Sequence, residues 1–160
     1  IYAHTPETGA SGLIINKPAA KTSFRDILDE LHIAHEELQD PPPVLLGGPV
    51  QITRGLILHS PDYRTNMTVS INDRIALTAT QDILYDMARG TGPRHSLLTL
   101  GHASWIRGQL EEEIMRNTWL ITGADTDLLF RYPCAQRWEA ALQKVGISQP
   151  AYLSHQGGRV

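Results

Sequence analysis

The chain has 160 residues, of which 41% are hydrophobic and 19% charged, and its formal net charge is −3. This composition is typical of one folded globular domain and excludes a disordered chain. The 14 lysines and arginines are scattered among 17 aspartates and glutamates. That balance argues against a large nucleic-acid-binding surface but leaves room for a local basic patch.

The number of cysteines and the length of the apolar runs indicate the cellular compartment. Cys134 is the single cysteine, so no intramolecular disulfide can form, and we expect a cytoplasmic protein. The apolar runs of the sequence are too short to cross a bilayer.

In the first half of the chain, short apolar runs predict strands at 13–16, 44–46 and 55–59. Ser23 is a candidate helix N-cap, because apolar residues follow it at helical spacing. That apolar stripe consists of Phe24, Ile27, Leu28 and Leu31. The sequence begins abruptly at residues 1–4, which we interpret as the end of a strand whose beginning is absent.

The next elements are a hairpin and a helix. Residues 67–71 and 75–78 predict two antiparallel strands joined by a short polar turn. Thr80 is a candidate cap for a helix that ends at Gly90. Its apolar stripe consists of Ile83, Leu84, Met87 and Ala88.

The last third of the chain predicts a buried strand at 97–100, a helix over 108–117 and a strand at 119–122. Pro133 suits the first turn of a final helix. Its expected stripe consists of Trp138, Ala141, Leu142 and Val145. The tail from residue 148 has no periodicity. Because no linker separates these elements, the sequence predicts one α+β domain over residues 1–160.

Three apolar runs end in polar tips. They are SGLIINKP at 11–18, RGLILHSP at 54–61 and LLTLGHAS at 97–104. The three tips could meet at one sheet edge and form a site. The alternative interpretation is that strands commonly end in polar residues.

The segment GHASW at 101–105 invites a hydrolase interpretation, but a nucleophile elbow needs a second glycine where Trp105 stands. His102 is also only two residues from Ser104, whereas triad partners usually come from distant segments. Ser104 is therefore predicted to be a turn or N-cap residue. Trp105 and Trp119 flank the predicted helix, where each indole N–H needs a partner.

No metal or nucleotide site is predicted. His32 and His35 have the spacing of a partial metal site, but no third ligand is suitably placed. The GGP turn at 47–49 lacks the lysine and hydroxyl of a phosphate loop. Glu111–Glu113 suit the first turn of a helix because of the helix macrodipole.

Several strings in order resemble the bacterial AlgH/YqgE family over nearly the whole chain. They are GLIINKP, LLGGPV, RGLILHS, TQDIL, GHASWIRGQLEEEIMRNTWL and RWEAAL followed by VGI. The resemblance implies an α+β fold with a bent mixed sheet that forms a pseudo-barrel with flanking helices. It also implies a cytoplasmic bacterial protein, in some cases labelled a candidate transcriptional regulator, with no established enzymatic activity or cofactor. The family pattern begins with a further strand-and-loop segment, often has tyrosine at position 102, and usually ends in glycine-histidine.

The resulting hypothesis is a non-enzymatic binding or regulatory protein that recognises a small molecule or protein partner at the common sheet edge. The candidate ligand-binding residues are Asn16, Lys17, Gly47, Gly48, His59, Gly101, His102 and Trp105. No cofactor and no metal are expected. The acidic balance and the lack of a helix-turn-helix motif argue against direct DNA binding.

An enzyme remains the alternative. It would use His59 or His102 as a base, with Ser60, Ser104 or Cys134 as the nucleophile.

Overall fold

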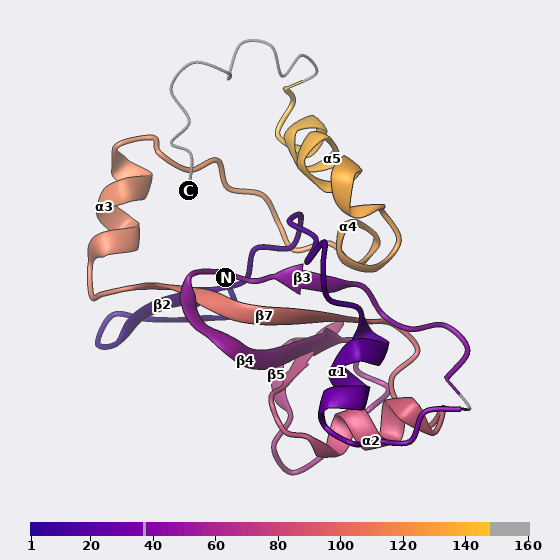
Figure 1. Ribbon diagram of the computed structural model, residues 1–160. Helices are drawn as coiled ribbons and strands as arrows, with labels where there is room; N and C mark the ends of the chain where they lie inside the picture. The colour runs from indigo at the N-terminus through magenta and orange to yellow at the C-terminus, as the bar shows by residue number, and fades with distance from the viewer. Residues whose placement is uncertain (37, 148–160) are drawn as a thin grey trace.

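The computed structural model describes residues 1–36 and 38–147, which form a mixed seven-stranded sheet with flanking helices (Figure 1). The strands are β1 (Ala3–Thr5), β2 (Gly9–Gly12), β3 (Val44–Leu46), β4 (Val50–His59), β5 (Val69–Asn72), β6 (Ile75–Thr78) and β7 (Ser96–Trp105). The helices are α1 (Phe24–Glu30), α2 (Asp82–Ala88), α3 (Gln109–Met115), α4 (Thr126–Phe130), the 3₁₀-helix η1 (Cys134–Gln136) and α5 (Arg137–Lys144).

Strand β7 is the centre of the sheet. The strand order is β1-β2-β7-β4-β6-β5, and β3 also pairs with β7. The β3 pairing is parallel, whereas β2 and β4 run antiparallel to β7. A register shift between Val50 and Gly55 of β4 bends the sheet. The bent, nearly closed sheet confirms the predicted α+β fold and its barrel-like form.

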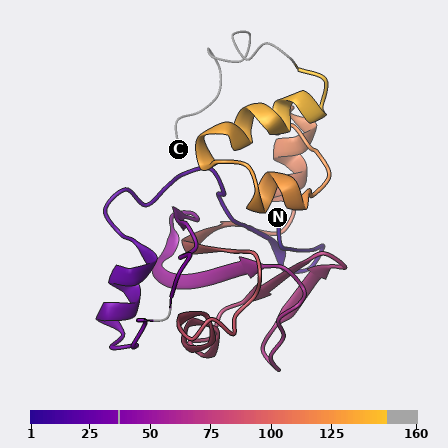
Figure 2. The same ribbon diagram turned by 90° about the vertical axis from the view of Figure 1, so that its right-hand side faces the viewer.

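Helices cover both faces of the sheet. Figures 1 and 2 show α1 and α2 on one face, with α4 and α5 on the other. One apolar cluster packs α1 and α2 against Ile57 and Leu98, and another joins Leu129 of α4 to Leu45 and Leu97. Burial on both faces explains why Leu97, Leu98 and Thr99 in the centre of β7 are all buried, rather than alternately buried and exposed. Within the described residues, no helix is long and apolar enough to cross a membrane.

Two predictions that rest on local chemistry are confirmed. Ser23 caps α1, because its hydroxyl accepts the Asp26 N–H while the Asp26 carboxylate accepts the Ser23 N–H. Strands β5 and β6 form the predicted hairpin, and the Asn72 side chain accepts the Arg74 N–H in its turn.

Three strand-region predictions were wrong. Residues 13–16 are not a strand; the chain pairs earlier, in β2, and then runs beside β3, where the Ile14 N–H bonds to Gly47 O at 2.8 Å. Ser104 is neither a turn nor a cap, because it lies in β7 opposite Ser11. Residues 119–122 form no strand, since β-propensity alone supplies no partner strand.

The helices also differ in detail from their predictions. Gln81, rather than Thr80, is the N-cap of α2. Helix α4, capped by the Asp125 carboxylate, was not predicted. The final helix begins at Arg137 because Pro133 precedes η1, and Trp138 stays 46% exposed. The buried residues of α5 are Arg137, Ala140 and Leu142, so of the predicted stripe only Leu142 is fully buried.

Candidate functional site

The predicted polar tips lie in two places rather than one. The Leu46 N–H donates to Lys17 O, and the Gly47 N–H donates to Leu100 O, both at 2.8 Å. The segments around residues 16–17, 47–48 and 101–102 are therefore neighbours, as predicted.

His59 is not part of this group. Strands β4 and β7 are antiparallel, so His59 pairs with Ser96, whereas Val50 pairs with His102. His59 and His102 are thus about 20 Å apart along the ladder, at roughly 3.3 Å per residue. The prediction of one common edge was wrong for His59, because the carboxyl end of β4 lies beside the amino end of β7. Trp105 lies further along β7, opposite Ala10.

Backbone packing explains the glycines of the first group. A Cβ on Gly47 would lie 2.3 Å from Gly101 O, and one on Gly48 would lie 2.1 Å from the carbonyl carbon of His102. Gly101 has φ +74°, and its Cβ would lie 2.5 Å from Gly48 O. We call this contact of Gly47, Gly48 and Gly101 the glycine crossing. A ligand at this place stays a prediction, for which Asn16 and Lys17 offer exposed side chains.

His59 is buried inside the protein, and both of its ring nitrogens have a hydrogen-bond partner. It is 0% exposed; its Nδ1 lies 2.8 Å from Ser60 O, and its Nε2 lies 2.9 Å from the Thr78 hydroxyl. A carbonyl only accepts, so Nδ1 carries the hydrogen and Nε2 accepts from Thr78. Thr78 in turn lies 2.9 Å from the Thr68 hydroxyl. Burial lowers the pKa of His59 and outweighs the opposing effects of Ser60 O and Asp62, which suits a neutral structural histidine.

The nucleophile candidates are engaged elsewhere. The Ser60 hydroxyl donates to His95 O at 3.2 Å. Cys134 is half-buried, with Sγ 3.7 Å from Ile15 O. Across residues 1–36 and 38–147, no hydrogen bond joins His59 or His102 to the side chain of Ser60, Ser104 or Cys134. The geometry therefore gives the enzyme alternative no support.

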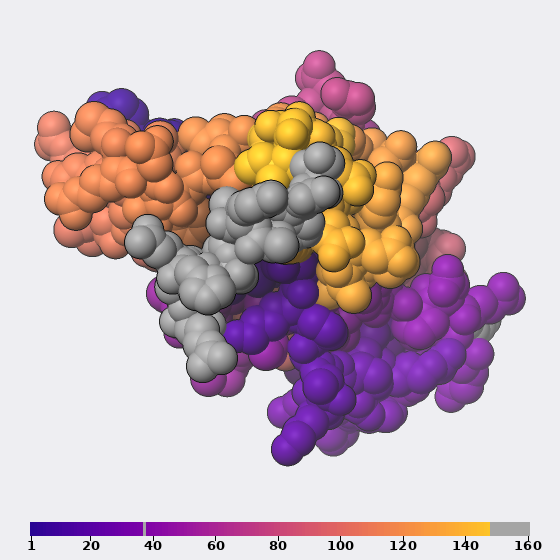
Figure 3. Space-filling view, turned by 90° about the horizontal axis from the view of Figure 1, so that it is seen from above, coloured from indigo at the N-terminus to yellow at the C-terminus, as the bar shows by residue number. Residues whose placement is uncertain are grey.

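Glu113 explains both tryptophans around α3. Its carboxylate accepts the indole N–H of Trp119 at 2.7 Å and that of Trp105 at 2.9 Å, and it also accepts from Gln109 at 2.9 Å. The two indole rings meet edge to face, with centroids 5.9 Å apart. The bonds from Trp119 and Trp105 hold the pKa of Glu113 below its usual value. This confirms that both indoles find partners, and it assigns Glu113 to anchoring α3 on β7. Figure 3 shows α3 beside the segment that leads to α4 and α5.

A groove of about 740 Å³ opens where two loops meet near the amino ends of β3 and β7. We call it the arginine groove. Its lining residues are Leu38, Gln39, Asp40, Pro41, Pro42, Pro43, Met87, Arg89, Gly90, Gly92, Pro93, Arg94, His95, Ser96 and Phe130. The basic side chains among them belong to Arg89, Arg94 and His95, and Asp40 is the acidic one.

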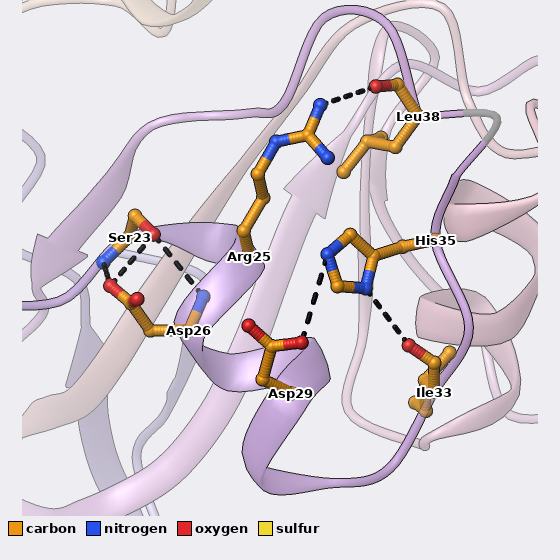
Figure 4. A network of polar contacts seen from close by, with 7 residues as sticks. All are labelled: Ser23, Arg25, Asp26, Asp29, Ile33, His35 and Leu38. Carbon is orange, nitrogen blue, oxygen red and sulfur yellow. Dashed lines mark hydrogen bonds and ion pairs between the residues drawn. The ribbon is translucent and has the colours of Figure 1, made fainter.

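The loop over residues 38–43 is one wall of the arginine groove, and it is tied to the protein at both ends. Arg25 of α1 donates to Leu38 O at 2.5 Å, as Figure 4 shows. At the other end, the Leu98 N–H of β7 donates to Pro43 O at 3.0 Å. Three consecutive prolines restrict the backbone between these ties. The wall is therefore preformed.

The loop over residues 89–96 is the opposite wall, and it is tied as firmly. Thr91 donates to Asp86 O through both its N–H, at 2.8 Å, and its hydroxyl, at 3.0 Å. The Arg94 N–H donates to an Asp62 oxygen at 3.0 Å, and the His95 N–H donates to the Ser60 hydroxyl at 3.1 Å. The rings of His95 and Phe130 stack with centroids 6.1 Å apart.

A second hollow lies beside the end of α1. Its lining includes His32, His35 and Asp29. His35 Nδ1 lies 3.0 Å from Ile33 O, and its Nε2 lies 3.8 Å from an Asp29 oxygen (Figure 4). The part of the chain that the structure describes contains no cluster of three metal-ligating side chains. These histidines instead close the turn after the helix.

The sequence missed the arginine groove because its walls are loops about 50 positions apart with no shared motif. The signals were the proline run at 41–43 and the arginines that flank a glycine-rich loop at 89–94. Only the fold brings these signals together.

Known proteins resemble this chain over nearly its whole length. The model of the family described as AlgH-like matches residues 1–150. A protein named UPF0301 from Jannaschia sp. (strain CCS1) is 45% identical over 160 residues, which cover 99% of this chain and 82% of that protein. One from Methylobacterium nodulans is 46% identical over 166 residues, covering 99% and 78%.

Two solved structures share the fold. The solution structure of the AlgH protein from Pseudomonas aeruginosa has a TM-score of 0.74 and 34% identity, covering 98% of this chain and 82% of that chain. A crystal structure of a protein from Corynebacterium diphtheriae has a TM-score of 0.67, covering 98% and 79%. At 15% identity, this second likeness concerns the fold alone.

Proposed function

The chain belongs to the AlgH-like family, and from that premise we propose that it is a non-enzymatic regulatory protein of the cytoplasm that binds a small ligand in the arginine groove. The lone cysteine suits that compartment. The proposal keeps the binding role expected from the sequence and moves its centre from the strand tips to the two loops.

The observation that carries this proposal is the preformed groove of about 740 Å³. Ligand pockets have volumes of roughly 300–1,000 Å³, and the groove falls within that range. Its lining is more polar than apolar: Arg89 and Arg94 supply charged groups, and Leu38, Met87 and Phe130 supply the smaller apolar part. Because both walls are tied at their ends, a ligand would not have to order them on binding.

A screen of a metabolite library on the purified protein, read by NMR, tests the proposal. Gln39→Trp places a large ring on an exposed position of the groove wall, and we expect it to abolish binding of the hit. Glu7→Trp, on the exposed turn between β1 and β2, is the matched control and should bind normally. Equal binding by both variants would place the ligand elsewhere and contradict the proposal.

The same hit separates binding from catalysis. A ligand that remains unchanged after long incubation supports a binding protein. Turnover that is lost in His59→Gln or His102→Gln would restore the enzyme alternative.

A protein partner at the strand tips is the second candidate. It is favoured by exposed apolar side chains beside Asn16, Lys17 and His102, because Leu46 is 39%, Val50 37% and Ile52 66% exposed. A photo-crosslinker at Ile52 should then capture one defined protein, and Lys17→Glu should weaken that capture. Equal capture from Met115, which is 75% exposed on α3, would indicate non-specific contact.

A further inference from the structure

We infer that the arginine groove is an anion site, which takes a small organic molecule through a phosphate or carboxylate group paired with Arg89 and Arg94. The inference rests on the proposed binding function and names the chemical class of its ligand.

The charges of the groove differ from those of the whole chain. The chain carries a net charge of −3, but the groove has two arginines against one aspartate, which gives +1 before His95 is counted. A concave basic lining raises the local concentration of anions. This is the local basic patch for which the scattered charges left room.

The two guanidinium groups of the groove are also available. In the described ranges, the arginines and lysine that form ion pairs are Arg116, Arg131 and Lys144. Arg89 and Arg94 form none within these ranges, and both are exposed. Their contacts with the fold run through the backbone, because the Arg89 N–H donates to Tyr85 O and the Arg94 N–H to Asp62. The backbone is thus fixed, and neither guanidinium is held in a salt bridge within the described ranges. The charge of Arg94 does act on Asp62, because it helps to lower the pKa of that carboxyl, so Arg89 is the less engaged of the two.

The chemistry of arginine selects the anion. The planar guanidinium matches the two oxygens of a carboxylate or phosphate and pairs with them by parallel hydrogen bonds. Two such groups on one wall of the groove suit one polyvalent head group or two neighbouring ones.

The remaining lining indicates that the anion has an organic body. A bare inorganic ion would fill little of about 740 Å³. The stacked His95 and Phe130 rings and the proline wall offer apolar surface to a carbon skeleton or ring. The inference is therefore a small organic anion rather than free phosphate alone.

Calorimetric titration of the full chain with inorganic pyrophosphate and, separately, with citrate tests the head group and distinguishes phosphate from carboxylate. The variants are Arg89→Gln and Arg94→Gln, each expected to weaken binding of the preferred probe about tenfold, the value of one charged hydrogen bond. Arg107→Gln makes the same charge change at an exposed position outside the groove lining and should stay within about twofold.

The outcomes separate the inference from the proposed function. Equal weakening in all three variants, or none, would overturn the anion site. If a library hit is lost in Gln39→Trp but retained in both groove variants, the groove binds ligands and the anion inference fails. If no library compound and no probe binds, the proposed function fails as well. Should Arg94→Gln not fold, Arg89→Gln still decides the question.

Discussion

The glycine crossing and the arginine groove both combine glycines with polar residues beside the central strand, yet they differ in what fills the space. At the glycine crossing, backbone atoms of β7 and of the loop before β4 occupy the positions that a Cβ would need. At the groove, a Cβ on Gly90 would meet nothing within 4 Å, although one on Gly92 would lie 2.4 Å from Cγ of Met87. The comparison teaches that a glycine-rich motif can mark close backbone packing, whereas an open site can arise from loops without any motif.

The largest expected effect is a difference in stability loss when one methyl group is added to each region, at Gly101 of the glycine crossing and at Gly90 of the arginine groove. Gly101 and Gly90 both have φ +74°, so alanine brings similar backbone strain of about 1 kcal/mol at each. At Gly101 the Cβ also meets Gly48 O at 2.5 Å, which raises the loss to about 3 kcal/mol or more. Urea unfolding of Gly101→Ala and Gly90→Ala measures the difference.

Gly123→Ala is the control for the measurement, because Gly123 lacks both the positive φ and any neighbour within 4 Å. Equal losses at Gly101 and Gly90 would mean that the crossing is not tightly packed, and the distinction between the two regions would disappear.

His59 is a third kind of position, because it is fully buried and its neighbour Ser60 bonds to His95 in one wall of the groove. His59→Gln leaves the Thr78 hydroxyl without its aligned acceptor and should destabilise the protein by about 2 kcal/mol. The groove wall itself should persist, because Ser60 bonds to His95 through its own atoms. Urea unfolding gives the loss, and the NMR shifts of residues 89–96 report the wall.

The pH dependence of His59 has a definite sign. Its folded pKa is lowered by burial, so below about pH 6.5, the ordinary value, the unfolded chain binds this proton more readily than the folded chain does. Stability is then complete above the ordinary pKa and declines as pH falls below it toward the folded pKa. This decline should be smaller in His59→Gln and unchanged in His32→Gln, which alters an exposed histidine. Parallel pH profiles for wild type and His59→Gln would contradict the assignment.

Features that depend on residues close together in the sequence could be predicted, whereas features that depend on distant segments could not. The Ser23 cap and the hairpin of β5 and β6 depend on residues within a few positions of each other, and both were predicted. The family resemblance was also confirmed, since the AlgH-like match covers residues 1–150. Residues 13–16 have the apolar character of a strand but not its pairing, because β3 occupies the adjacent part of β7.

The spatial arrangement of the polar tips was predicted in part, for the same reason, and ligand binding at these tips stays a prediction. The tips at 16–17, 47–48 and 101–102 meet because their segments run side by side. The predicted position of His59 was wrong because the sequence pattern does not reveal that β4 and β7 are antiparallel. The arginine groove depends on three segments, the loops at 38–43 and 89–96 and Phe130, whose approach no local pattern encodes.

Glu113 provides a smaller test, at a contact between side chains rather than backbones. Its pKa is lowered chiefly by the bonds from Trp119 and Trp105, so the stability it contributes is present above the unfolded carboxylate pKa and is lost as pH falls through the folded one. We expect the fluorescence of the Trp105–Trp119 pair to change in that acidic range before the helical signal is lost.

Two variants define the Glu113 response. Glu113→Gln should shift the emission already at neutral pH and remove most of the acid response. Glu112→Gln, one position away on the same helix and exposed, should retain it. A retained response in Glu113→Gln would show that another carboxylate controls the tryptophans.

The smallest expected effect is binding of duplex DNA, which asks whether the arginine groove serves a polyanion as well as a small anion. Two arginines neutralise about two phosphates, so the salt slope should be near −2, and the dissociation constant about 10⁻⁴–10⁻⁶ M or weaker at physiological salt. Fluorescence anisotropy with labelled duplexes at several salt concentrations measures both. The double variant Arg89→Gln/Arg94→Gln should flatten the slope, while Arg107→Gln, outside the groove, changes it less. Sequence-selective binding at nanomolar concentration with a steep slope would require many more phosphate contacts than the groove provides. It would then favour direct transcriptional regulation over the small-ligand role.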